Sequence, residues 1–265
     1  MADSLIPKLT ASLKKYYHDE LGIPNYEEHI QKRILYNEES IVALIQKIER
    51  YVGSLIGARV LSIGSGWGEF ALVASNYGAI VTGIEPDKER LEIANLRSTT
   101  NCTFIEGYGE SLPFLDNSFD FIECQSVLEH VQDIKKVIAE IIRVLKVGGS
   151  CYIQVPNYFY PTESHYKILW LPMMPKSIAK VYLKLRGRNP KFIETINYTN
   201  PILLRKILKS HNNILMFNIG HPPKLYGGNT IKQKIKRKGW NLLVGVYSFF
   251  GIEEAPIEVI IKKCV

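Results

Sequence analysis

The stretch Val60–Gly68 reads VLSIGSGWG and decides the fold class of this chain. It includes most of a short apolar segment, Arg59–Ile63, which is typical of a buried strand. Glycines follow at positions 64, 66 and 68, and a helix is expected from 68 to about 77. Glycine lets a backbone turn tightly and approach a ligand, because no Cβ stands in the way. This order of strand, glycine loop and helix predicts a ligand at the carboxyl end of the strand.

Strands and helices continue to alternate on the C-terminal side of this loop. Short apolar strands separated by helices predict a parallel sheet with helices on both faces. A helix over 38–51 precedes the first strand, because apolar residues recur there at helical spacing. The expected strands are 59–63, 80–84, 102–106, 119–124 and 150–155, and the expected helices are 68–77, 86–98 and 131–145. Pro86 lies in the first turn of the second of these helices, and Gly148-Gly149 separates the third helix from the fifth strand.

The pattern changes after Pro156. Residues 157–198 and 221–255 show no strand–helix unit and are interpreted as two insertions. Asn200-Pro201 predicts the start of a helix that continues to about 210, and strands are expected at 213–219 and 257–262. The chain is therefore divided into an N-terminal helical extension (1–57), a core (58–156), and the insertions with the last helix and the last two strands of the same domain (157–265).

The formal net charge of +7 conceals a strong asymmetry along the 265 residues. Residues 1–155 carry 15 Lys+Arg against 21 Asp+Glu, whereas residues 156–265 carry 18 against 5. A basic C-terminal part suggests an anionic partner or surface, and a solvated basic surface is the alternative.

The four cysteines are far apart in the sequence and have no metal-ligand spacing, so reduced thiols and no metal site are expected. The chain contains no apolar run of about 18 residues, and its first residues lack the pattern of a signal peptide. A cytoplasmic location, with association to a membrane surface as a further expectation, follows from these features.

The glycine loop alone does not define the ligand. A dinucleotide-binding oxidoreductase has GxGxxG at this place, whereas the spacing here is GxGxG and position 69 is Glu. Four further motifs follow in order, at 104–114, 117–120, 127–131 and 143–149. With the loop, this series closely resembles the class I S-adenosylmethionine-dependent methyltransferases, in particular the small-molecule branch that includes the ubiquinone-biosynthesis O-methyltransferases. The resemblance covers about residues 58–156.

This resemblance implies a doubly wound, Rossmann-like sheet of seven strands, mostly parallel with a final antiparallel strand, flanked by N-terminal helices and by a cap built from the two insertions. It also implies S-adenosylmethionine as the cofactor. The glycines of the loop would line its methionine part, Glu85 would bind the ribose, residues 109–111 would lie along the adenine, and Gln125 would lie near the sulfonium. The implied cofactor-binding residues are Ser62, Gly64, Ser65, Gly66, Gly68, Glu85, Pro86, Tyr108, Gly109, Glu110, Ser111 and Gln125.

Two of these positions depart from the family pattern. The family usually has an acidic residue where Ser62 stands and an aspartate where Tyr108 stands. Ser62 can donate a hydrogen bond but supplies no charge to offset the ammonium group of the cofactor. Tyr108 can stack on the adenine but cannot accept a hydrogen bond as a carboxylate does.

Methyl transfer from a sulfonium is an in-line displacement whose leaving group needs no acid, so the enzyme supplies orientation. A hydroxyl acceptor also needs a general base, most often a histidine. His130 is the first candidate because Glu129-His130 follows the fourth strand, and His165 in the first insertion is the second. Packing or capping of the next helix is the alternative role of His130. The sequence lacks the Asn/Asp-Pro-Pro-Tyr/Phe motif of many amine-methylating enzymes, which favours an oxygen acceptor by analogy.

Both insertions place apolar runs beside basic ones, as at 168–175 and 176–191, which is typical of an element at a membrane surface. A lipid-linked, saccharide or other small-molecule acceptor is therefore expected, and a lid with solvated lysines is the alternative reading of the same segments. RNA methylation, an NAD-dependent oxidoreductase and a non-catalytic adenosyl-nucleotide-binding protein remain alternative functions. Binding to nucleic acid is disfavoured, because no RNA-binding module is visible.

Overall fold

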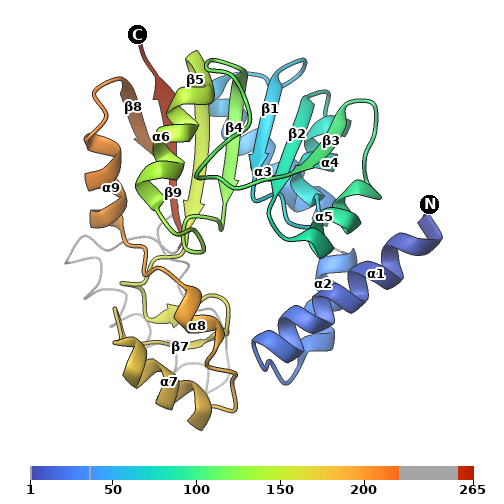
Figure 1. Cartoon of the computed structure of the whole chain (residues 1–265), viewed down its shortest axis with the longest axis vertical. Coiled ribbons are helices and arrows are strands. Elements are labelled where there is room, and N and C mark those ends of the chain that lie inside the picture. The colour runs from blue at the N-terminus through green and yellow to red at the C-terminus, as the bar shows by residue number, and fades with distance from the viewer. Residues whose placement is uncertain (1, 36, 221–255) are drawn as a thin grey trace, which may run out of the picture.

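A seven-stranded sheet forms the centre of the protein in the computed structural model, which describes residues 2–35, 37–220 and 256–265 (Figure 1). The strand order is β3-β2-β1-β4-β5-β9-β8, and β9 runs antiparallel to both of its neighbours, β5 and β8. The predicted seven-stranded, mostly parallel sheet is thus confirmed. The strands are β1 (Arg59–Ile63), β2 (Ile80–Glu85), β3 (Cys102–Glu106), β4 (Phe119–Gln125), β5 (Leu145–Val155), β8 (Ile214–Asn218) and β9 (Ile257–Lys263).

The position of β1 sets the location of the site. This strand pairs in parallel with β2 on one side and with β4 on the other. The chain runs from β1 outward to β2 and β3 and then crosses back to β4 on the other side of β1. The strand order therefore reverses at β1, and a crevice opens beyond its carboxyl end. Four of its five residues are buried, as expected for a strand covered on both faces.

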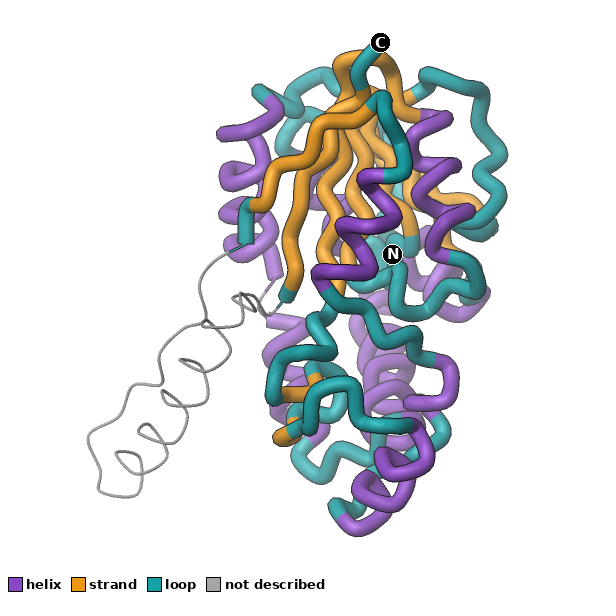
Figure 2. Tube along the Cα trace, turned by 90° about the vertical axis from the view of Figure 1, so that its left-hand side faces the viewer, coloured by secondary structure: helices purple, strands orange, loops and turns teal. Residues whose placement is uncertain are grey.

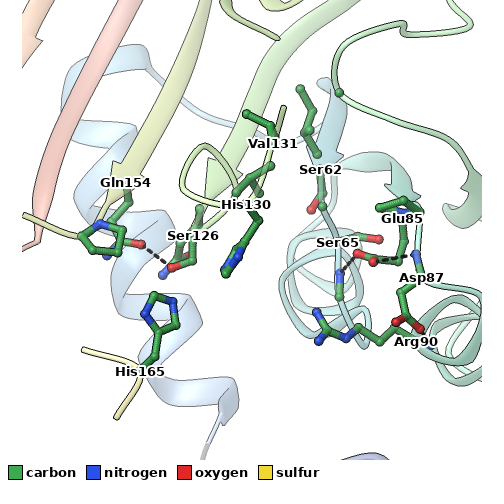
Figure 3. A pocket seen from close by; sticks show the side chains of 18 of the residues that line it. Ser62, Ser65, Glu85, Asp87, Arg90, Ser126, His130, Val131, Gln154 and His165 are labelled. Carbon is green, nitrogen blue, oxygen red and sulfur yellow. Dashed lines mark hydrogen bonds between the residues drawn. The ribbon is translucent and has the colours of Figure 1, made fainter. Parts of the chain in front are cut away.

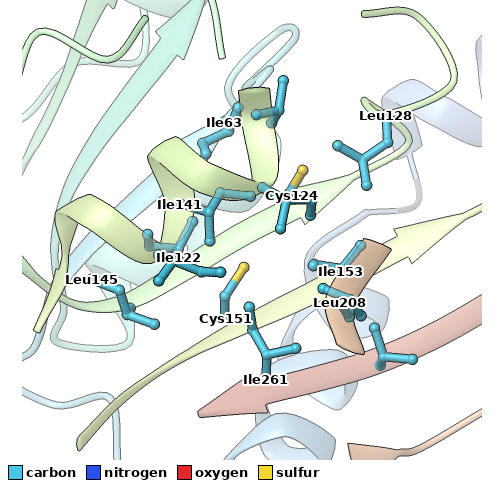
Figure 4. Close-up of a cluster of buried hydrophobic side chains, with 14 of the residues drawn as sticks. Ile63, Ile122, Cys124, Leu128, Ile141, Leu145, Cys151, Ile153, Leu208 and Ile261 are labelled. Carbon is cyan, nitrogen blue, oxygen red and sulfur yellow. The ribbon is translucent and has the colours of Figure 1, made fainter. Parts of the chain in front are cut away.

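Helices cover both faces of the sheet (Figures 1 and 2). One face packs against α6 (Ile134–Val144) and α9 (Pro201–Lys209). The other packs against α3 (Asn37–Val52), α4 (Glu69–Asn76) and α5 (Lys88–Asn95). The first of these cores joins α6 to β4, β5 and β9 and includes the thiols of Cys124 and Cys151 (Figure 4). These two cysteines and Cys102 are buried.

Three predicted boundaries are wrong. Helix α5 begins at Lys88 rather than at Pro86, because the Asp87 carboxylate caps it by accepting from the Arg90 amide. Helix α6 begins at Ile134 rather than at 131, because Asp133 caps it in the same way. Gly148-Gly149 lies inside β5, where the pairing with β4 is irregular and Gly148 has a φ of +81°.

A cap lies beyond the carboxyl edge of the sheet (Figure 1). Its N-terminal part consists of α1 (Ala2–Lys14), the π-helix η1 (Lys15–Glu20) and α2 (Tyr26–Leu35). The first insertion contributes β6 (Thr162–Glu163), β7 (Ile168–Leu169), α7 (Lys176–Leu185) and α8 (Phe192–Thr195). The two parts share one apolar cluster, in which Leu21 and Ile23 pack with Trp170. The second insertion, 221–255, lies outside the described residues. Among the helices that the structure describes, none is long and apolar enough to cross a membrane.

Candidate functional site

A cleft of about 1220 Å³ lies between the carboxyl ends of the strands and the cap. Its core end is formed by the glycine loop and Glu85, and its cap end by His130 and His165 (Figure 3). Gly68 and Ser111 are not among the residues that line it. The predicted site residues that do line it are Ser62, Gly64, Ser65, Gly66, Glu85, Pro86, Tyr108, Gly109, Glu110, Gln125, His130 and His165.

The three glycines of the loop have different reasons to be glycine. Gly64 and Gly66 have φ values of +61° and +58°, in the left-handed region that disfavours other residues. A Cβ on Gly64 would lie 2.6 Å from Cγ2 of Val127, whereas a Cβ on Gly66 would meet nothing within 4 Å. The backbone at Gly66 therefore faces open space in the cleft. A Cβ on Gly68 would lie 2.7 Å from Cζ of Phe104, so this glycine allows close packing of α4 on the sheet.

Glu85 ends β2 at the edge of the cleft and is 4% exposed. Its carboxylate accepts hydrogen bonds from the amide of Gly66 at 2.8 Å and from the amide of Asp87 at 3.1 Å. Burial raises the pKa of Glu85 above its ordinary value. The two amides hold the carboxylate beside the loop, where its remaining lone pairs can accept from the hydroxyls of a ligand.

A buried carboxylate that the sequence did not single out lies directly beside Ser62. Ser62 is opposite Glu123 in the β1–β4 pairing, and its hydroxyl donates to the Glu123 carboxylate at 2.7 Å. Both residues line the cleft, and both are less than 5% exposed. Burial raises the pKa of Glu123 to about 7. The acidic group that β1 lacks is therefore supplied by the neighbouring strand, which could be found only with knowledge of the strand register.

The segment after β3 forms another wall of the cleft. Tyr108 is 60% exposed and lies at the cleft with its ring available for stacking. The carboxylate of Glu110 accepts from the amide of Gln132 at 2.8 Å and so ties this segment to the chain after β4. The amide of Ser111 donates to the carbonyl of Tyr108. Ser111 thereby closes the turn rather than facing the cleft.

The histidines at the cap end come from different parts of the chain. His130 follows β4 and His165 lies between β6 and β7, and their ring centroids are 5.4 Å apart (Figure 3). Nδ1 of His165 is hydrogen-bonded to the Glu163 carboxylate at 2.7 Å. That carboxylate also accepts from the Tyr158 hydroxyl at 3.0 Å and from the Tyr166 amide at 2.6 Å. Burial alone would raise the pKa of Glu163, but His165 and these donors lower it below its ordinary value.

His130 and Glu129 have opposite surroundings although they are adjacent. The His130 ring is exposed to the cleft, and protein atoms around it displace part of its hydration shell. This desolvation, together with the nearby His165, lowers the pKa of His130 to about 3. His130 is therefore neutral near pH 7. The Glu129 side chain is fully buried, and burial raises its pKa to about 7. Its Oε1 atom lies 3.9 Å from Nε2 of His165.

Comparison with known proteins explains the core end of this cleft. Residues 61–153 match the family model described as Methyltransferase domain. A demethylmenaquinone methyltransferase from Chlorobaculum tepidum is 30% identical over 183 residues, which cover 68% of this chain and 74% of that protein. The chain belongs to the S-adenosylmethionine-dependent methyltransferases.

Other relatives of the methyltransferase match over a shorter range. The Bacillus subtilis methyltransferase YcgJ is 39% identical over 104 residues, covering 38% of this chain and 41% of YcgJ. A ubiquinone biosynthesis O-methyltransferase from Vibrio cholerae is 36% identical over 110 residues, covering 39% of this chain and 44% of that enzyme. The chain thus spans less than half of the length of these two relatives.

Solved structures show the same fold at low identity. The crystal structure of Bacillus YcgJ has a TM-score of 0.56 at 21% identity and covers 86% of this chain and 99% of that one. A S-adenosylmethionine-dependent methyltransferase from Mesorhizobium loti has a TM-score of 0.53 at 15% identity, with 85% of this chain and 96% of that one covered.

The residues at the core end of the cleft of the methyltransferase fit S-adenosylmethionine, its cofactor. Glu85 offers carboxylate oxygens of the kind that bind ribose hydroxyls, and Gly66 leaves room for backbone contact with the methionine part. Glu123 offers a negative charge for the ammonium group, and Arg33, which also lines the cleft and pairs with Glu69, offers a positive charge for the carboxylate. When bound, the cofactor supplies an electrophilic methyl group on a sulfonium. The ammonium and carboxylate groups of the cofactor thus each have an oppositely charged side chain in this cleft.

Proposed function

We propose that the methyltransferase transfers the methyl group to an oxygen atom of a small, amphiphilic acceptor bound at the cap end of the cleft. The observation that carries the proposal is the continuity of the cleft from Glu85 to His165. Its volume of about 1220 Å³ exceeds the approximately 300–1,000 Å³ of pockets for one small ligand. Cofactor and acceptor therefore have room side by side, which is the arrangement that an in-line displacement needs.

The proposed reaction is a single displacement. A lone pair of the acceptor oxygen forms the new O–C bond, and the C–S bond breaks with its electron pair going to sulfur. The hydroxyl proton passes to a histidine or to water at the cap end of the cleft, which His130 and His165 line. The general-base roles predicted for His130 and for His165 stay predictions. Of the two, His165 is the one held in a fixed orientation by a carboxylate, that of Glu163.

An oxygen acceptor is supported by the residues beside the cofactor. Strand β4 ends in Cys124-Gln125 and Ser126 follows it, without the proline–aromatic pair that many amine-methylating enzymes have there. Among the relatives, the Vibrio protein is described as a ubiquinone biosynthesis O-methyltransferase. The position of the transferred methyl group distinguishes an oxygen acceptor from a nitrogen acceptor.

An amphiphilic acceptor is supported by α7 in the cap. Ile178, Val181 and Leu185 are 57%, 59% and 81% exposed and lie on one face of this helix at spacings of three and four residues. Three lysines at 176, 180 and 184 lie along the same helix. An exposed apolar face beside basic residues is typical of a helix that lies on an anionic membrane surface. We therefore propose that this face contacts the membrane that holds a lipid-linked acceptor.

The test is an assay with S-adenosylmethionine carrying a labelled methyl group. Candidate acceptors are soluble phenols, saccharides, the same head groups on lipid tails in vesicles, and tRNA. The proposal expects O-methylated product from the amphiphilic acceptors, located by mass spectrometry and NMR. Label only on nitrogen, or only on tRNA, would contradict it. The Glu85→Ala variant, which lacks the expected ribose contact, is the control for transfer that depends on the cofactor site.

A further inference from the structure

Three potential metal ligands converge at the cap end of the cleft. The ligand atoms of Glu129, His130 and His165 all lie within 4.8 Å of one another. Glu129 and His130 follow β4, whereas His165 belongs to the turn between β6 and β7 in the first insertion. The histidine from the insertion completes the cluster, so the sequence alone gave no ligand spacing from which to recognise it.

Glu129 contributes a buried carboxylate that has no hydrogen-bond partner among the described residues. Its side chain is fully buried, and neither carboxylate oxygen accepts a hydrogen bond from another residue in the described parts of the chain. A buried carboxylate is costly unless a cation, a proton or hydrogen-bond donors compensate its charge. The backbone at Glu129 is held in place, since its carbonyl accepts from the backbone amide of Asn197 at 2.7 Å.

His165 presents a lone pair toward this carboxylate. The Glu163 carboxylate, which also accepts from Tyr158 and Tyr166, can only accept, so the Nδ1 atom of His165 carries the hydrogen in their 2.7 Å contact. In the neutral ring, Nε2 is then an acceptor, and it lies 3.9 Å from Oε1 of Glu129. Two acceptors that face each other repel unless a metal cation or a proton lies between them. A histidine held by a carboxylate on its other nitrogen is also the usual arrangement around metal-binding histidines.

We propose that Glu129, His130 and His165 bind a divalent cation, with Glu163 orienting His165 from behind. Two imidazoles and one carboxylate suit Zn²⁺, Mn²⁺, Fe²⁺ or Co²⁺ better than Mg²⁺, which prefers oxygen ligands. Metal–ligand distances of about 2.0–2.2 Å require the ligand atoms to move together by about 1 Å. Within the described parts of the chain the site has three protein ligands, and it opens into the cleft through His130, so coordination positions remain for an acceptor.

This inference rests on the proposed function for its consequence, not for the binding itself. A cation at this position lies where the acceptor hydroxyl is proposed to bind, and a bound cation lowers the pKa of a coordinated hydroxyl. An acceptor with two neighbouring oxygens would coordinate the cation through both of them. Hydroxyl activation would then pass from a free histidine base to the cation.

The test is calorimetry on the complete chain after removal of metals with a chelator. Titration with Zn²⁺, Mn²⁺ and Mg²⁺ is compared for the parent protein and for Glu129→Gln, His130→Ala, His165→Ala and Glu163→Gln. We expect about one Zn²⁺ or Mn²⁺ per parent chain and weaker binding of Mg²⁺. Affinity should fall at least 100-fold in the three ligand variants, and about 10- to 100-fold in Glu163→Gln. His211→Ala, which removes a histidine outside the cleft, should bind as the parent does.

Binding of S-adenosylmethionine by every variant shows that each is folded. The absence of saturable metal binding in the parent, or equal binding by the parent and the ligand variants, would overturn the metal site and leave a proton as the partner of Glu129. The two proposals fail separately. If the protein methylates oxygen but binds no metal, the metal site is refuted and the proposed function stands. If it binds metal but methylates only nitrogen, the oxygen acceptor is refuted and the metal site stands.

Discussion

The Glu123→Gln substitution is the sharpest test of the ammonium end of the cofactor site. The Glu123 carboxylate accepts a hydrogen bond from Ser62 at 2.7 Å and lies in the floor of the cleft. Glutamine keeps the shape and an acceptor oxygen but cannot ionise. The substitution thus separates the charge of Glu123 from its packing.

The expected effect on stability has a definite sign. Burial raises the pKa of Glu123 from 4.5 to about 7 in the folded protein. Below pH 4.5 the carboxyl is protonated in both the folded and the unfolded chain, so burial of the charge costs nothing there. Between pH 4.5 and 7 the unfolded chain releases the proton first, so the folded state loses stability as the pH rises. At about 1.4 kcal/mol per pH unit, the full cost above pH 7 is on the order of 3 kcal/mol.

Urea unfolding at pH 5 and pH 8 measures this cost. The Glu123→Gln variant should gain stability relative to the parent as the pH rises, by up to about 3 kcal/mol. The Glu106→Gln variant is a matched control, because Glu106 is at the end of the neighbouring strand β3 and its side chain is 50% exposed. That control should stay within about 0.5 kcal/mol of the parent at both pH values.

Binding of S-adenosylmethionine to Glu123→Gln should be weaker by about 10- to 150-fold at pH 8, because a hydrogen bond to a charged group contributes about 1.5–3 kcal/mol. The ratio of variant to parent affinity is taken at each pH, so titration of the cofactor's own amine cancels. Moving the carboxylate back to β1, with Ser62→Asp and Glu123→Ser together, should restore most of the affinity. Parental affinity of Glu123→Gln at pH 8, with parallel stability profiles, would refute the reasoning.

Three further predictions concern the loop, the ribose contact and the cap. Glu85→Ala removes the acceptor of the Gly66 amide and should weaken S-adenosylmethionine binding at least 10-fold in calorimetry, and unchanged affinity would refute the ribose role. Gly64→Ala should lower stability by about 1–3 kcal/mol in urea unfolding, with partial recovery in a double variant with Val127→Ala, because its Cβ would lie 2.6 Å from Val127. Val181→Asp on α7 should reduce flotation with anionic vesicles, whereas Leu115→Asp, at an 84% exposed position away from the cap, should not, and equal flotation would contradict the membrane contact.

The core of the fold was predictable because its signals are local. Short apolar strands alternate with helices from 59 onward, and each of these strands is present in the sheet. Where boundaries were wrong, a local signal had been passed over, since Asp87 and Asp133 are side chains of the kind that cap helices. Gly64 and Gly66 line the cleft because they come directly after β1, and Glu85 lines it because it ends β2.

The rest of the site depends on long-range contacts that no local pattern encodes. Glu123 reaches Ser62 only through the β1–β4 register. His165 reaches Glu129 only because the insertion folds back over the carboxyl edge of the sheet. In the sequence, Glu123 and His165 are visible only as polar residues in a strand and in a turn. Their partners become known only from the three-dimensional structure.

Calorimetry with S-adenosylmethionine, S-adenosylhomocysteine and NAD tests the central claim most directly. The cleft should bind both adenosyl compounds, with Glu85 required for each, and should not bind NAD. Binding of NAD without binding of either adenosyl compound would contradict the assignment of the Val60–Gly68 loop to a methyltransferase.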